Sequence, residues 1–552
     1  MFLSVLQVLL IPAVSWVLWR ILRPYVVRSS LDDIPGPPAD SLIYGNFKQL
    51  FDRHGWSFHD NMEDLYGPIV KIRGMFQKPA LYVFDPKALH HIVLTDQNIW
   101  ERPSFMIAST RLMFGTGLLG VLDRMPGDVH RKQRKMLNPV FSIGHMRSMT
   151  PIFYNTAHRL RDAISAHSDA QGKEIDILNW MGRTALELIG QGGLGYSFDP
   201  LVTTTHNSYG DSLKALLPTL ARCTGFRMFS HHGSKLGPPS LRRFLISLIP
   251  NRDIQQLREI VDTMDRQSSN ILSGKRSALR AGDEAVKQQV GEGKDIMSIL
   301  LRANMATSGD DRLSEDELLG QMSTLVFAAT DTTSNALART LNLLAERQDA
   351  QDKLRAEILA AGQGEDIPYD QLVDLPYLDA VCRETLRLHS PVSFTAREAR
   401  RDIVLPFSTP VRATDGTLLN EIVVPKDTLL MIGVRACNRS KALWGEDALE
   451  WKPERWLSPD GIPSSVKNAG IPGVYSNLMT FLGGGNSCIG FKFSQLEMKV
   501  ILAALLSSFK FTLSDKEICW NLADVAYPTV GPISRTPSMP LNVEPVEKAA
   551  FI

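Results

Sequence analysis

Few cysteines and an almost balanced charge limit what this chain of 552 residues can be. Five residues are cysteine, and an odd total argues against a disulfide framework. Four of them form no CxxC pair and no zinc-like spacing, so we expect a protein body in a reducing compartment. The balance of 60 Lys and Arg against 59 Asp and Glu gives no indication of a nucleic acid partner. The four unpatterned cysteines are Cys223, Cys382, Cys437 and Cys519.

Linkers and cofactor fingerprints are also missing. No Gly/Ser-rich or low-complexity segment divides the chain after residue 40, so residues 41–552 are predicted to form one body. Gly483, Gly484 and Gly485 do not fit the G-x-G-x-x-G turn that follows a strand in dinucleotide-binding folds. Any flavin or nicotinamide chemistry would therefore belong to a separate protein.

One long apolar run is present at the N-terminus. Residues 1–19 carry no charge and have about the length that crosses a bilayer core, so they are predicted to be a transmembrane anchor. Arg20, Arg23 and Arg28 follow, which favours a cytosolic location for the rest of the chain. Residues 20–40 are predicted to be a basic flank and a proline-rich hinge. A cleaved signal peptide is the alternative, but no basic segment precedes the run and no A-x-A-like site follows it.

Hydrophobic periodicity predicts a mainly α protein with a smaller β-rich region. Apolar residues recur at three- and four-residue spacing in several long segments, which is typical of amphipathic helices. Two early β-like segments are joined through a glycine-containing turn. A charged stretch at 274–312 is expected to contain a solvated linker. The predicted helices are 156–166, 254–279, 315–345 and 351–361, and the predicted strand regions are 69–72, 80–84 and 403–430.

Cys488 lies in the run FLGGGNSCIG, which starts at Phe481 and ends at Gly490. Consecutive glycines allow a close approach of the backbone to a bulky flat group, and Phe481 is placed to shield one side of the sulfur. Gly490 opens an apolar-patterned helix, so the thiol is expected near a helix N-terminus, where the thiolate that binds metals is favoured. A small buried cysteine is the plain alternative. The glycine run makes that alternative the weaker one.

The spacing F-x-x-G-x-x-x-C-x-G resembles the ligand loop of the haem-thiolate monooxygenases, the cytochrome P-450 family. The resemblance extends from the proline hinge to about Val546. It implies a cytochrome P-450-like haem-thiolate fold and haem b as cofactor, with Cys488 as the axial iron ligand. It also places Phe481, Gly484 and Gly490 beside the cofactor.

A second pattern is the stretch Ala328–Thr333 inside the longest predicted helix. Ser314 and Glu317 form an S-x-x-E capping box at its start, so Asp331 and Thr332 lie well inside the helix. An acid beside threonines is locally unfavourable there, because these side chains compete for backbone hydrogen bonds. By the resemblance, Thr332 and Asp331 are catalytic and deliver protons during oxygen activation. The alternative is a threonine that merely bonds back to its own helix.

A third pattern joins Glu384 and Arg387, three residues apart on a helix, to Arg455 in a later P-E-R-W run. Glutamate and arginine at this spacing face the same side, and a second guanidinium can add another fork to the carboxylate. A single E-x-x-R is weak evidence, because most such pairs are solvated. The order of the two motifs resembles the family's Glu-Arg-Arg cluster, which implies a structural role in holding the cysteine loop.

The resemblance also implies partners for the two haem propionates. His130 and Arg134 align with the family's W-x-x-x-R stretch, with histidine in place of tryptophan. Arg397 aligns with the arginine that follows the E-x-x-R helix. Asn486 stands where the family most often has arginine or histidine, so a hydrogen bond replaces an ion pair there.

Substrate and partners follow from the resemblance as expectations. The segments implied to line the pocket are mostly apolar, which favours a lipophilic substrate such as a terpenoid, sterol or fatty acyl compound. The predicted function is a monooxygenase that inserts one oxygen atom from O2, with electrons from NADPH–cytochrome P-450 reductase, at the endoplasmic reticulum membrane with the catalytic domain in the cytosol. The alternatives are a haem-thiolate isomerase or dehydratase without a reductase, and a non-enzymatic haem sensor. The implied lining is Phe105–Val121, Phe327, Ala328, Val392–Thr395 and Thr529–Pro532.

Overall fold

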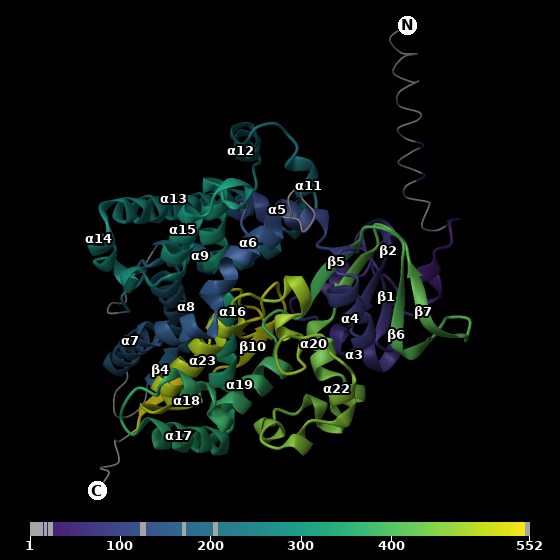
Figure 1. Cartoon of the computed structure of the whole chain (residues 1–552). Helices are drawn as coiled ribbons and strands as arrows, with labels where there is room; N and C mark the ends of the chain where they lie inside the picture. Colours follow the sequence, from purple (N-terminus) through teal and green to yellow (C-terminus); the bar gives the residue numbers. More distant parts are fainter. Residues whose placement is uncertain are drawn as a thin grey trace. The chain divides into compact units, whose positions relative to one another are not determined.

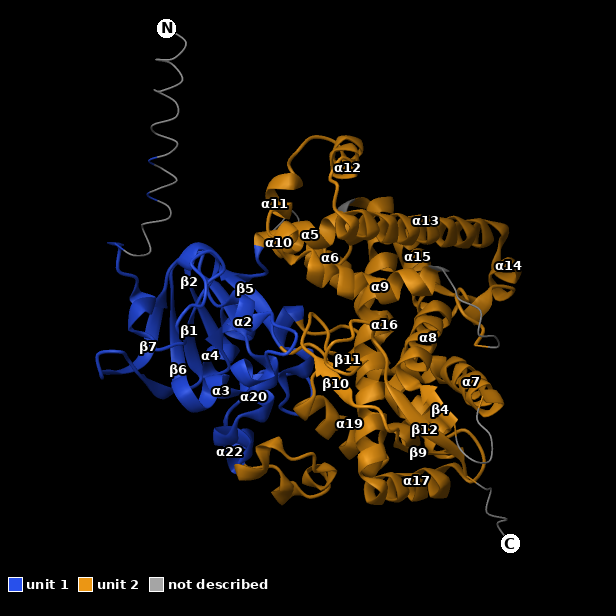
Figure 2. Ribbon diagram, turned by 180° about the vertical axis from the view of Figure 1, so that it is seen from behind, with its two compact units in different colours: residues 1–103, 394–445, 464–486 blue, residues 104–393, 446–463, 487–552 orange. Residues whose placement is uncertain are grey.

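The computed structural model describes residues 15, 19, 26–121, 129–167, 173–201 and 208–546. The chain divides into two compact units, each built from separate stretches of sequence (Figure 2). The first unit holds residues 1–103, 394–445 and 464–486, and the second holds residues 104–393, 446–463 and 487–552. Almost all of the predicted anchor, 1–19, lies outside the described residues. Among the helices that are described, none combines the length and apolar character needed to span a bilayer.

The first unit is organised around a five-stranded sheet with the order β1-β2-β8-β5-β3. β1 and β2 pair antiparallel, with Ile69 opposite Val83, which confirms the predicted early hairpin. β8 joins β2 in parallel and β5 in antiparallel register, while β6 and β7 form a separate hairpin. Its strands are β1 Ile69–Arg73, β2 Pro79–Val83, β3 Trp100–Glu101, β5 Thr395–Ala399, β6 Ile403–Arg412, β7 Leu418–Val424 and β8 Leu429–Ile432, and its helices include α2 Phe47–Leu50, α3 Trp56–Tyr66, α4 Pro86–His90, α20 Val434–Arg439, α21 Lys441–Trp444 and α22 Ser464–Asn468.

The second unit is mainly helical and carries two small sheets, β4-β12-β9 and β10-β11 (Figure 1). Its longest helix, α16, packs most extensively against α8, while α23 packs against α7. The longer helices are α5 Ser104–Phe114, α6 Val129–Leu137, α7 Ile143–His167, α8 Ile177–Leu188, α9 Ser208–Arg222, α12 Pro239–Ser247, α13 Arg252–Ala281, α15 Ile296–Ala306, α16 Glu315–Glu346, α17 Gln348–Gly362, α19 Pro376–Leu388 and α23 Phe491–Leu506. The short helices are α10 Thr224–Arg227, α11 Ser230–Gly233, α14 Asp283–Lys287 and α18 Tyr369–Val373, and the strands are β4 Lys173–Asp176, β9 Phe509–Leu513, β10 Ile518–Asn521, β11 Tyr527–Val530 and β12 Pro540–Pro545.

The charged stretch 274–312 is more ordered than its composition predicts. It contains the last turns of α13, the short α14 and the buried helix α15. Lys275 and Asp295 form an ion pair at 2.9 Å with both side chains almost fully buried. The expected solvated linker is found between α13 and α15, where most of residues 281–294 are exposed, whereas Lys275 and Asp295 are buried because each supplies the other's charge and hydrogen bonds.

α16 begins at the predicted capping box. The Ser314 hydroxyl accepts from the Glu317 backbone N–H at 3.2 Å, and the Glu317 carboxylate accepts from the Ser314 N–H at 2.8 Å. Residues 320–326 and 333–338 of this helix are buried throughout. Between them, Ala328 is exposed and Asp331 and Thr332 are partly exposed. The helix is therefore open along about one and a half turns, at the position of the predicted acid–alcohol pair.

Candidate functional site

The glycines before Cys488 are required by the protein's own backbone. A Cβ on Gly483 would overlap the carbonyl oxygen of Pro472, and one on Gly484 would overlap the carbonyl oxygen of Val93. Gly484 also has φ +66°, a left-handed conformation that favours glycine. The Gly485 N–H donates to Gln97 Oε1 at 2.9 Å. The sequence argument held that the glycines make room for a flat group. It identified the need for glycine but not its main cause, which is the close approach of other backbone segments.

Cys488 is a free cysteine, accessible from solvent, two residues before the N-cap Gly490 of α23. Although the residue is accessible, the protein around its sulfur raises the pKa of the thiol above the usual range. The N–H of Gly490 and the charge of Arg134 act in the opposite direction. The donor near the helix N-terminus acts as predicted and favours the thiolate, but desolvation outweighs it in the protein alone. Binding of a metal ion would deprotonate the sulfur.

Arg134 on α6 holds the residue next to the cysteine. Its guanidinium donates to the Ser487 carbonyl oxygen at 2.6 Å and to the Ser487 hydroxyl at 3.0 Å. His130, one turn earlier on the same helix, is buried. A predicted propionate ligand therefore also acts as a brace for the cysteine loop, a role that the sequence did not indicate.

The other predicted cofactor residues belong to the first unit. Arg397 on β5 is buried, and its guanidinium donates to the Ala396 carbonyl oxygen at 2.9 Å. Asn486 ends a short 3-10 turn, Gly484–Asn486. Phe481 packs edge-on against Tyr475, with ring centroids 5.6 Å apart. Its predicted shielding of the sulfur stays a prediction.

The acid–alcohol pair lies on the open stretch of α16. Burial raises the pKa of the Asp331 carboxyl to about 7, and the positive charge of Lys214 on α9 opposes this shift. An acid with a pKa near 7 can both hold and release a proton at neutral pH. The Thr332 hydroxyl donates to the Ala328 carbonyl oxygen at 2.8 Å, as the plain alternative predicted. Thr330 makes the same bond to Val326, but on the buried side of the helix.

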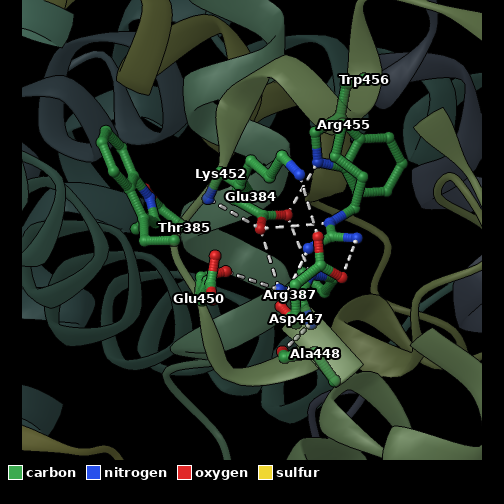
Figure 3. A network of polar contacts seen from close by, with 10 residues as sticks. Glu384, Thr385, Arg387, Asp447, Ala448, Glu450, Lys452, Arg455 and Trp456 are labelled. Carbon is green, nitrogen blue, oxygen red and sulfur yellow. Dashed lines mark hydrogen bonds and ion pairs between the residues drawn. The ribbon is translucent and has the colours of Figure 1, made fainter. Parts of the chain in front are cut away.

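The Glu384 carboxylate is the centre of a buried polar network (Figure 3). Arg387 donates two bonds to it at 2.8 Å, and Arg455 Nε lies 3.4 Å away. Trp456 Nε1 donates at 2.9 Å and the Lys452 backbone N–H at 3.1 Å. The Glu-Arg-Arg cluster is therefore formed, and it ties α19 to the 447–456 segment. That it holds the cysteine loop stays a prediction.

These residues fit a flat, iron-containing cofactor. Cys488 offers an unbridged thiol of the type that binds haem iron, on a residue that is exposed. The exposed small residue Ala328, followed by Asp331 and Thr332, gives α16 a face that a flat group can approach. Arg134, His130 and Arg397 are of the types that bind propionates. The mainly helical fold and this set of residues define a haem-thiolate protein.

Comparison with known proteins identifies the family. Residues 35–529 match the sequence profile of cytochrome P450. Cytochrome P450 monooxygenase 91 of Postia placenta is 56% identical over 546 residues, which cover 99% of each chain. Ganoderic acid synthetase of Ganoderma lucidum is 46% identical over 547 residues, 98% of this chain and 99% of that protein. The chain belongs to the cytochrome P450 family, as the resemblance predicted, and is a P450 monooxygenase that binds haem b through a cysteine thiolate.

Several residues of the site were missed from the sequence. Ser487, Gln97 and Val93 shape the cysteine loop through contacts with backbone atoms. Such contacts leave no pattern along the chain, because they depend on segments far apart in sequence. Trp456 could have been found, since it follows Arg455 directly in the P-E-R-W run and carries an N–H donor.

Proposed function

We propose that this P450 monooxygenase inserts one oxygen atom from O2 into a lipophilic small molecule, a terpenoid or another secondary metabolite. The observation that carries the proposal is the acid–alcohol pair Asp331 and Thr332 on the open stretch of α16. A haem-thiolate isomerase or dehydratase needs no such proton-delivery pair. The name of the Ganoderma relative, a ganoderic acid synthetase, supports a substrate from fungal secondary metabolism.

Each site residue has a proposed role. Cys488 is the axial ligand of haem b, and the bound haem supplies the iron that activates oxygen. His130, Arg134 and Arg397 bind the propionates, with Asn486 as a weaker donor. Phe481, Gly484 and Gly490 shape the loop around the sulfur.

Proton delivery is assigned to Asp331 and Thr332. The Asp331 carboxyl takes a proton from solvent, which its pKa of about 7 permits. The Thr332 hydroxyl donates to the Ala328 carbonyl at rest. When it turns away from that carbonyl, it can donate its proton toward the reacting oxygen and take up a replacement proton supplied through Asp331.

The electron donor is proposed to be a separate NADPH–cytochrome P-450 reductase, because the sequence contains no dinucleotide fingerprint. Residues 1–19 are proposed to anchor the protein in the endoplasmic reticulum membrane by a single span, with the body in the cytosol. Deletion of residues 1–28 should release the protein from the membrane fraction and leave the haem spectrum intact. Loss of haem on truncation would refute a separate anchor.

The assignment of the ligand is tested by Cys488→Ser, with Cys519→Ser as the control. Cys519 is also a free and partly accessible cysteine, but it lies on β10. The Cys488 variant should lose the red-shifted carbon monoxide band of thiolate-ligated haem and all turnover, while the control keeps both. An unchanged spectrum in Cys488→Ser would overturn the assignment. Screening lipophilic compounds with the reductase and NADPH then tests the reaction.

A further inference from the structure

The segment that follows α5 lies directly on α16. The Phe114 ring stacks on Phe327, with centroids 4.4 Å apart and planes 27° apart. Three residues further on, Gly117 meets Gly320 so closely that a Cβ on either glycine would overlap the backbone of the other. The segment 114–118 therefore contacts α16 at two levels, one beside the open stretch and one about two turns before it.

Two buried glutamines fix this segment in place. Gln133 on α6 donates to the Thr116 carbonyl oxygen at 2.8 Å, and its own Oε1 accepts from Gln321 Nε2 on α16 at 2.7 Å. Gln321 Oε1 in turn accepts from the Leu118 N–H at 3.1 Å. We call this chain of bonds, Thr116–Gln133–Gln321–Leu118, the amide latch. It connects α6 and α16, through the two glutamine side chains, to the backbone of the segment.

The latch is buried, so its bonds are not easily replaced by water. Both glutamines are 0% exposed. Gln133 also donates to Glu317 at 3.0 Å, the residue that completes the capping box of α16. A buried amide that loses its partner also lacks hydrogen bonds from water. The arrangement in which both glutamines keep their bonds is therefore strongly preferred over one in which either bond is broken.

The segment held by the latch borders the predicted reaction site. Phe327, on which Phe114 rests, is partly exposed and comes directly before the exposed Ala328. Asp331 and Thr332 follow within about one turn of the helix. The stacked pair Phe114 and Phe327 therefore lies at the start of the open stretch of α16, about one turn from the acid–alcohol pair.

We propose that Gln133 and Gln321 are positioning residues that hold segment 114–118 as a wall of the substrate site and thereby limit which large apolar ligands fit. The proposal rests on the proposed function. It adds residues that touch neither haem nor substrate and act through the wall.

The same helix also links the wall to the cysteine loop. Gln133 is part of the amide latch, and its neighbour Arg134 donates hydrogen bonds to Ser487, the residue before Cys488. Both residues are neighbours on α6, Val129–Leu137.

The test compares two azole probes on the haem-loaded protein by optical titration. Imidazole is small and reports only access to the iron. Clotrimazole is a bulky apolar azole that must also pack against segment 114–118. Gln321→Met should weaken clotrimazole binding by about tenfold, the scale of a misfitted apolar contact, and change imidazole binding by less than about twofold. Loss of amide protection at Leu118 in hydrogen exchange should accompany it.

Gln351→Met is the matched control. Gln351 is also 0% exposed and bonds to the backbone of Leu344 and Phe511, away from the latch. It should lower stability without changing the ratio of the two azole affinities. The proposal would be overturned if Gln321→Met and Gln351→Met changed the affinity for clotrimazole equally, or if Gln321→Met left that affinity unchanged.

A second variant covers the case in which Gln321→Met does not retain haem. Gly117→Ala places a Cβ against the Gly320 carbonyl and displaces the segment from its own side. It should give the same selective loss of clotrimazole binding, and an unchanged ratio would refute the wall. If the wild-type protein binds both azoles but forms no product from lipophilic compounds with the reductase and NADPH, the proposed function fails instead, so the two failures are distinguishable.

Discussion

Replacement of Glu384 by glutamine should cause a large loss of stability. The substitution keeps the shape of the side chain but removes its charge and one acceptor. Arg387 would then be left fully buried and without the carboxylate that pairs with it. Its bond to the Ala448 carbonyl at 2.7 Å does not neutralise the charge, whereas Arg455 keeps a second ion pair with Asp447 at 3.0 Å.

The magnitude follows from the number of donors that lose their partner. Breaking a buried ion pair by removing one member costs about 3–5 kcal/mol, because the other charge stays buried. Removing a single donor should cost less. Trp456→Phe keeps an aromatic ring but removes the N–H at 2.9 Å together with the five-membered part of the indole, and the lost bond to a charged group should cost about 1.5–3 kcal/mol.

Urea unfolding of the haem-loaded protein, followed by tryptophan fluorescence, measures both changes. Asp349→Asn is the control, because Asp349 pairs with Arg347 at 2.8 Å while both side chains are more than half exposed. An exposed pair of this kind contributes about 0–1 kcal/mol. If Glu384→Gln costs no more than Asp349→Asn, the network does not stabilise the fold and the reasoning is wrong.

Three further predictions concern the chemistry of the site. Thr332→Ala should divert reducing equivalents into hydrogen peroxide with haem binding intact, since general-acid delivery contributes about 10²–10⁴-fold. The control Thr330→Ala should leave the yield of product per NADPH unchanged. An equal loss of product in the two variants would contradict the assignment. Because burial raises the pKa of Asp331 from 3.8 to about 7, its contribution to stability is complete below pH 3.8 and is lost as the pH rises through about 7. Asp331→Asn should therefore flatten the fall in the free energy of unfolding between pH 3.8 and about 7, and parallel curves for the two proteins over this range would refute the shifted pKa. Arg397→Ala should lose more haem on dilution than Asn486→Ala, because a charge-assisted bond is stronger by roughly 1 kcal/mol, and the opposite order of haem occupancy would show that the roles are reversed.

The helices were predicted best where local signals agree. α16 was expected at 315–345 and is found at Glu315–Glu346, because the capping box and the apolar spacing coincide. For α7 the sequence predicted only 156–166, whereas the helix begins at Ile143. Pro151 lies inside its first half, where a proline normally argues against a helix. Tertiary packing overrides the local signal there.

The residues of the site also divide into those that local sequence signals predict and those that they do not. Glu384 and Arg387 could be predicted because the pair is three residues apart and its chemistry is legible in the motif. The Gln133–Gln321 bond spans 188 residues and joins two uncharged side chains, so neither periodicity nor charge pattern indicates it. The desolvation that raises the pKa of Cys488 was not predicted, because a sequence shows nearby donors but not the density of protein around a sulfur.

The contacts of Gly483 and Gly484 with Pro472 and Val93 have a consequence for substitutions in this stretch. These contacts, and the bond from Gly485 to Gln97, involve polypeptide only. The demand for glycine is therefore set by the polypeptide itself and does not depend on the cofactor. A bulkier residue at Gly483 should then lower the stability of the fold at the Pro472 carbonyl, in addition to any effect on the bound haem.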